Sequence, residues 1–164
     1  MKKKYILAII LLAIIGVSAL YLWQRDKFVE GHTPFSREEI MQIFNDNETK
    51  FDYIVTVLKG SNLKGVDIRI KRTTKEIYID EAKADTIRPY SEVMPSDDQF
   101  EAFLIDLLVQ ENLGKICIDF DGNIDFGPNF PITYSENDRR VDDNPEPIWG
   151  KLKENWYYYI HIPI

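Results

Sequence analysis

The sequence predicts an α+β fold, in which an N-terminal transmembrane helix precedes one domain with an antiparallel sheet of about five to six strands packed against two or three helices. Three observations predict it. The chain begins with a long uncharged run, three later stretches carry apolar residues at helical spacing, and six short runs alternate between apolar and polar residues. Because the helices and strands do not alternate regularly, an antiparallel sheet is expected rather than a parallel doubly wound one.

The first twenty-three residues predict a membrane anchor. The nineteen residues from Tyr5 to Trp23 carry no charge, and at about 1.5 Å per helical residue they would span roughly 28 Å. The lysines at positions 2–4 would hold the N-terminus in the cytoplasm. The alternative is a cleaved secretory signal, since residues 17–19 are small. We expect a retained signal anchor, and therefore a single-pass cell-membrane protein whose C-terminal domain is extracytoplasmic.

After the anchor, residues 24–34 are polar and are expected to form a tether to a domain covering residues 35–164. Ser36-Arg37-Glu38-Glu39 matches a capping box, in which the serine hydroxyl and the Glu39 carboxylate each accept a hydrogen bond from the other residue's backbone amide. A helix should therefore begin at this point. Asn45-Asp46-Asn47 is expected to interrupt or re-cap it, and a second helical segment should end near Gly60.

A third helix is predicted after Ser96. Ser96-Asp97-Asp98-Gln99 resembles a second capping box. The apolar residues that follow make a continuous stripe at helical spacing, and Gly114 should close this element. This stripe should face the core of the domain.

The strands are predicted from alternation. Val66 to Ile70 and Ile77 to Ile79 should form an antiparallel hairpin. Residues 81–95 are charged, hold two prolines and are expected to form a loop. The later strands are "KICIDF", "NIDF", "PITYS" and "NWYYYIHI", and the stretch between the last two, "ENDRRVDDNPEPIWGKLKE", is predicted to be an acidic loop.

The stretch "ICIDFDGNIDFG", residues 116–127, has three aspartates around a glycine and invites comparison with a calcium loop. An EF-hand loop beginning at Asp119 would need glycine at its sixth position and glutamate at its twelfth. Those positions hold Ile124 and Phe130. A hairpin turning at Asp121-Gly122, with the aspartates on its solvated face, is therefore predicted instead of a metal site.

Composition restricts the partners. Without the lysines at positions 2–4, seventeen basic residues remain against twenty-seven acidic ones, a net charge near −10. Such a domain should repel nucleic acid and attract a basic partner. The only cysteine, Cys117, has no intramolecular disulfide partner, and His32 and His161 lie far from it in sequence. We therefore predict no metal, no cofactor and no enzymatic activity. The oligomeric state is left open.

The lysine-started span, the "FNDNETKFDYIVTVLKG" segment and the "ENWYYY" near the end resemble small uncharacterised single-span exported proteins of Gram-positive bacteria. The resemblance implies export and a membrane anchor. It implies no activity and assigns no catalytic residues.

Two functions are open. The first is an acidic, membrane-anchored binding module of immunity-like or envelope-associated type, whose protein partner has a basic surface. Its candidate binding residues are Asp138, Asp142, Asp143 and Glu146 in the acidic loop, with Tyr157 and Tyr159 in the last strand. The alternative is a small cell-envelope hydrolase or carbohydrate-binding protein that uses carboxylates and exposed aromatics. Convergent carboxylates in a deep cleft would favour the second, and a shallow acidic or aromatic face would favour the first.

Overall fold

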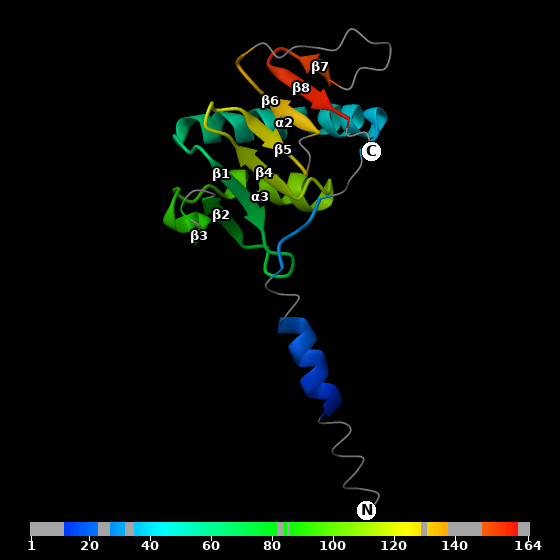
Figure 1. The fold of residues 1–164 in the computed structure, drawn as a ribbon, viewed down its shortest axis with the longest axis vertical. Helices are drawn as coiled ribbons and strands as arrows, with labels where there is room; N and C mark the ends of the chain where they lie inside the picture. The colour runs from blue at the N-terminus through cyan, green and yellow to red at the C-terminus, as the bar shows by residue number, and fades with distance from the viewer. Residues whose placement is uncertain are drawn as a thin grey trace, which may run out of the picture.

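The computed structural model describes residues 12–22, 27–31, 35–81, 84, 86–128, 131–137 and 149–160. These residues form an eight-stranded antiparallel sheet in the order β3-β2-β1-β4-β5-β6-β8-β7, with helices α2 and α3 behind it in the view of Figure 1. The strands are β1 (Val66–Ile70), β2 (Ile77–Glu81), β3 (Thr86–Pro89), β4 (Lys115–Ile118), β5 (Ile124–Phe126), β6 (Ile132–Tyr134), β7 (Trp149–Lys153) and β8 (Trp156–Tyr159).

The predicted number of strands is wrong, because the sheet has eight strands rather than five or six. The two strands that the sequence did not indicate, β3 and β7, form the two edges of the sheet. Strand β3 has no buried residue and ends at Pro89, and proline is tolerated at an edge because its missing N–H is not needed there. Strand β7 contains Gly150 and two lysines. Neither edge strand carries the apolar alternation from which the inner strands were predicted.

Helix α2 (Arg37–Gly60) begins with the predicted capping box. The Ser36 backbone N–H donates to Glu39 Oε2 at 2.8 Å, and the Glu39 N–H donates to Ser36 Oγ at 3.2 Å. The two predicted helical segments are one helix with a kink at Asn47, whose φ and ψ are −124° and 15°. The Asn47 side chain is 4% exposed and donates to Ile43 O and to Glu111 Oε1, both at 3.0 Å. The interruption predicted at residues 45–47 is therefore confirmed.

Helix α3 (Asp98–Ile105) follows a 3-10 turn, η1 (Tyr90–Glu92), and continues into a π-helical turn, η2 (Asp106–Gln110). Its cap is Asp97 rather than the predicted Ser96. The Asp97 carboxylate accepts hydrogen bonds from the backbone of Gln99 at 3.1 Å and of Phe100 at 3.0 Å, so this carboxylate satisfies amides that have no partner within the helix.

The core lies between the sheet and the two helices. Side chains that are at most 1% exposed come from α2, α3 and the inner strands, and include Phe51, Ile54, Leu104, Ile68, Ile116, Phe126 and Trp156. Aromatic rings from α2, β5 and β8 meet here: Phe51 lies 4.9 Å from Phe126 and 5.5 Å from Trp156, between ring centroids. Trp156 of the last strand is therefore part of this core.

The predicted transmembrane helix is wrong. Among the described residues, no helix has both the length and the apolar character that crossing a membrane requires. Within the predicted span, the structure describes residues 12–22, which are helical, whereas a helix that crosses a bilayer needs about 20 apolar residues. The signal anchor and the single-pass cell-membrane localisation depended on the full uncharged run and are corrected with it. Residues 1–11 and 23–26 lie outside the described residues.

Part of the segment predicted as a tether packs on the sheet. The Val29 N–H donates to Ile70 O at 2.8 Å, and the Arg72 N–H donates to Lys27 O at the same distance. Val29 is 8% exposed. Residues 27–29 therefore extend the domain beside the end of β1, while the helix of residues 12–22 stands apart from the sheet (Figure 1).

Candidate functional site

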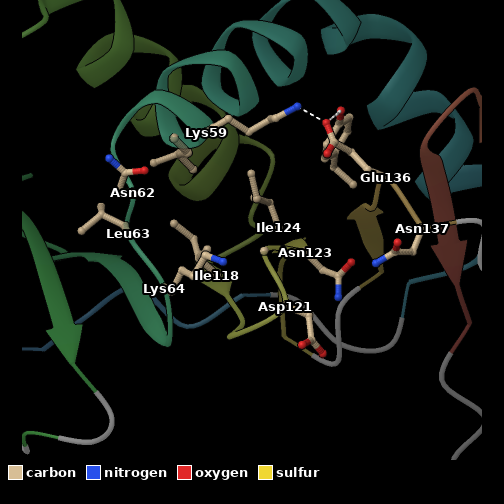
Figure 2. A pocket seen from close by; sticks show the side chains of 13 residues that line it. Lys59, Asn62, Leu63, Lys64, Ile118, Asp121, Asn123, Ile124, Glu136 and Asn137 are labelled. Carbon is tan, nitrogen blue, oxygen red and sulfur yellow. Dashed lines mark hydrogen bonds and ion pairs between the residues drawn. The ribbon is translucent and has the colours of Figure 1, made fainter.

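A polar cleft of about 350 Å³ opens where the C-terminal end of α2 meets the β4–β5 turn and the end of β6; we call it the α2 cleft (Figure 2). Two cations line it, Lys59 of α2 and Lys64 of the following loop. Its other polar side chains are Asn62, Asp121, Asn123, Glu136 and Asn137. The lining also includes the Tyr134 ring, Gly122, the half-buried Leu63 and three buried apolar residues, Leu58, Ile118 and Ile124.

The β4–β5 turn shapes one side of the α2 cleft. The Asp119 carboxylate accepts hydrogen bonds from the backbone N–H groups of Asp121 and Asn123, each at 2.9 Å, and from Asn123 Nδ2 at 2.6 Å. Gly122 has a φ of 89°, a conformation that L side chains rarely adopt. The turn holds the Asp121 carboxylate exposed at the rim. The hairpin predicted for residues 116–127 is therefore confirmed, with Cys117 paired to Asp125.

Lys59 spans the opposite side of the α2 cleft. Its ammonium group forms an ion pair with the Glu136 carboxylate, as the dashed line in Figure 2 marks, and lies 5.5 Å from the centroid of the Tyr134 ring. The Tyr134 hydroxyl donates to Glu136 Oε1 at 3.5 Å. The hydrogen bond with Glu136 raises the pKa of Lys59, and the same bond lowers the pKa of Glu136. Tyr134 and Glu136 together form a binding position for a cation, which we call the cation seat.

A second, smaller hollow of about 290 Å³ lies beside the α2 cleft, and Lys59 and Tyr134 line both. Its outer side includes Asp52. Near it, Lys153 Nζ donates to Glu48 Oε1 at 2.6 Å and to Asp52 Oδ2 at 2.8 Å. Partial burial acts to lower the pKa of Lys153, but these hydrogen bonds raise it overall. The ammonium groups of Lys59 and Lys153 thus each lie near both a carboxylate and an aromatic ring.

The chain segment that contains η1, α3 and η2 is acidic. Between Pro89 and Gly114 the chain has six acidic residues and no basic one. These are Glu92, Asp97, Asp98, Glu101, Asp106 and Glu111. Within the described part of the chain, only Asp106 of this set forms an ion pair, with Lys50 at 3.0 Å. We call residues 89–114 the acidic segment.

The acidic segment ends beside a further hollow of about 350 Å³ between η2 and the N-terminal half of α2. Three carboxylates and no basic side chain line it: Glu39, Asp46 and Glu111. Glu111 also accepts the hydrogen bond from Asn47. The kink in α2 therefore contributes to the shape of this hollow.

The candidate residues predicted from the sequence have different outcomes. Asp138, Asp142, Asp143 and Glu146 lie outside the described residues, and so do His32 and His161. Tyr157 is only 2% exposed, and Tyr159 is half-buried, with its ring centroid 4.8 Å from that of Trp149.

The prediction that all three hairpin aspartates are solvated is wrong for one of them, Asp125. Asp125 is 7% exposed and accepts a hydrogen bond from Thr133 Oγ1 at 2.6 Å. It lies opposite Cys117, on the face of the sheet away from the helices. Cys117 is half-buried.

Within the described residues, no three or more histidine, cysteine, aspartate or glutamate side chains are grouped so that they could hold a metal ion. Comparison with family models, with curated proteins and with solved structures found no match.

Proposed function

We propose that the protein is a binding protein without catalytic turnover, and that its partner is a protein with a basic surface. The observation that carries the proposal is the acidic segment, where six carboxylates occur without a basic residue. An excess of one charge in a segment of the surface steers a partner of opposite charge and speeds its association. The same charge disfavours nucleic acid, whose phosphates it repels.

The shape of the surface agrees with this proposal. The acidic hollow at Glu39, Asp46 and Glu111 provides a concave place for a basic side chain. The α2 cleft combines lysines and amides with the carboxylates of Asp121 and Glu136. Glu136 is paired with Lys59 and not with a second carboxylate, as the alternative hydrolase would need. Both features are typical of a recognition surface rather than of a hydrolytic centre.

The experiment compares two triple variants with the same change in net charge. The first, Glu92→Gln with Asp98→Asn and Glu101→Gln, neutralises exposed or half-exposed groups of the acidic segment and leaves the Asp97 cap and the Lys50–Asp106 pair intact. The second, Glu30→Gln with Glu76→Gln and Glu154→Gln, neutralises three exposed groups elsewhere. The probe is fluorescein-labelled hexalysine, followed by anisotropy at low and at physiological ionic strength.

We expect the first variant to bind the peptide roughly five-fold more weakly, and the second to change affinity less than about two-fold. The difference should shrink at higher salt, since exposed charges are screened. Equal weakening in both variants would mean that only net charge matters, and would contradict the proposal that this surface recognises the partner.

A further inference from the structure

Lys59 occupies the cation seat of the α2 cleft from within the same chain. Its ammonium group lies near a carboxylate and an aromatic ring, those of Glu136 and Tyr134. Both groups favour a lysine or arginine side chain in a binding site. The chain itself therefore shows which chemistry the seat selects: a primary ammonium or a guanidinium group.

A basic side chain of another molecule can replace Lys59 in its contact with Glu136. The Lys59 and Glu136 side chains are 43% and 62% exposed, and exposed ion pairs are weak in water. By comparison, Lys153 is 31% exposed and donates three hydrogen bonds to two carboxylates. Lys59 is thus the more readily displaced of the two lysines.

Displacing Lys59 would also change the shape of the surface. Lys59 and Tyr134 line both the α2 cleft and the smaller neighbouring hollow, so the Lys59 side chain stands at their boundary. Once it leaves Glu136, the boundary between the two hollows opens. The carboxylates that line them are Asp121 and Glu136 in the α2 cleft and Asp52, which is bonded to Lys153, in the smaller hollow. Carboxylates spaced along a joined groove suit an extended segment with more than one basic side chain.

We propose that the α2 cleft binds a basic peptide segment of the partner protein, and that a lysine or arginine of that segment replaces Lys59 between Glu136 and Tyr134. The inference rests on the proposed function, since it names the anchor for the same basic partner. Lys59 then acts as an internal competitor. The affinity of the groove is reduced by the fraction of molecules in which Lys59 occupies the seat.

The test uses the full chain and labelled hexalysine, with variants matched in charge. Lys59→Gln removes the competitor, and Lys64→Gln removes the same charge from the same cleft, at an exposed lysine without a carboxylate partner among the described residues. Glu136→Gln removes the seat, and Asp121→Asn is its matched control. Because all four side chains are exposed, the variants should fold, and unfolding midpoints verify this. Lys59→Met, which keeps the stem, serves as a second competitor-free variant.

We expect Lys59→Gln and Lys59→Met to bind the peptide about two- to five-fold more tightly than Lys64→Gln does. Glu136→Gln should bind it about five-fold more weakly than Asp121→Asn does. Equal affinities within each matched pair would overturn the inference. If the affinities are equal within each matched pair but the triple variant of the acidic segment still binds more weakly, the proposed function stands and only the role of the α2 cleft is overturned. If no chain binds hexalysine, Lys59→Gln included, both are overturned.

Discussion

Cys117 and Asp125 face each other across β4 and β5 on the side of the sheet away from the helices. Asp67 of β1 pairs with Cys117 on its other side, so the thiol lies between two carboxylate-bearing residues. Burial, followed by the hydrogen bond and charge of Asp67, raises the pKa of Cys117 to about 12 from its ordinary value of 9.0. The thiol is therefore protonated at neutral pH.

We predict that Cys117 reacts slowly with iodoacetamide in the native protein. Only the thiolate is nucleophilic, and a rise in pKa from 9.0 to about 12 reduces its population at pH 8 by roughly a hundred- to a thousand-fold. Alkylation followed by mass spectrometry should therefore be slower than in the denatured chain by about this factor. The native rate should continue to rise with pH well beyond 9.

A matched pair of variants tests the cause. Asp67→Asn should lower the pKa of Cys117 and speed its alkylation. Asp80 lies opposite Asp67 on β2, one strand further from Cys117, and Asp80→Asn should leave the alkylation rate unchanged. A native rate that reaches its plateau near pH 9 would show that the thiol is not perturbed.

Single residues were predictable only where their environment follows from local alternation. The pattern of the "KICIDF" strand places Cys117 on its less buried side, and the structure agrees. The same reasoning placed Asp125 in solvent, but this residue is buried and bonded to Thr133 of the neighbouring strand. Alternation reports which face a side chain is on, and does not report whether that face is covered.

Among the elements, the inner strands and the start of α2 were predictable, and the sheet edges were not. The inner strands bury one face and so alternate, as β1 does with Val66, Ile68 and Ile70 buried. Edge strand β3 exposes Ile87 by 50%, and β7 is irregular between Lys151 and Lys153. Edge strands are held by backbone pairing on one side, which leaves little trace in the sequence.

The kink in α2 gives a prediction for this element. Asn47→Ala removes two hydrogen bonds from a buried side chain and leaves Glu111 without this donor. The variant should lower the free energy of unfolding by about 1–3 kcal/mol in urea denaturation. Asn45→Ala, at an exposed position of the same helix, should change it by less than about 0.5 kcal/mol. If the two variants were equally stable, the hydrogen bonds of Asn47 to Ile43 and Glu111 would contribute nothing measurable to the stability of the kinked helix.

For the whole molecule, the composition predicted the overall acidity, and the sequence could not predict where the surface becomes concave. The α2 cleft brings together Lys59 and Glu136, which are 77 positions apart, through the packing of α2 against the strand ends. No local pattern marks such a pair, because it depends on the register of the entire sheet. The contact of residues 27–29 with β1 was missed for the same reason, since Phe28 and Val29 lie in a polar stretch without periodicity.

The packing of residues 27–29 predicts where the folded domain begins. A chain that starts at residue 27 keeps the buried Val29 side chain and both backbone hydrogen bonds to the β1 end, together with the Phe28 ring beneath the Arg69 guanidinium at 4.6 Å. It should unfold in urea at the midpoint of the full chain. A chain that starts at residue 35, the boundary expected from the sequence, loses all of these contacts and should be less stable by roughly 2–5 kcal/mol. Val29→Ala in the full chain isolates the buried side chain and should cost about 1–2 kcal/mol. If the two truncated chains had the same midpoint, the segment would contribute nothing to stability and would act as the tether that its polar sequence indicates.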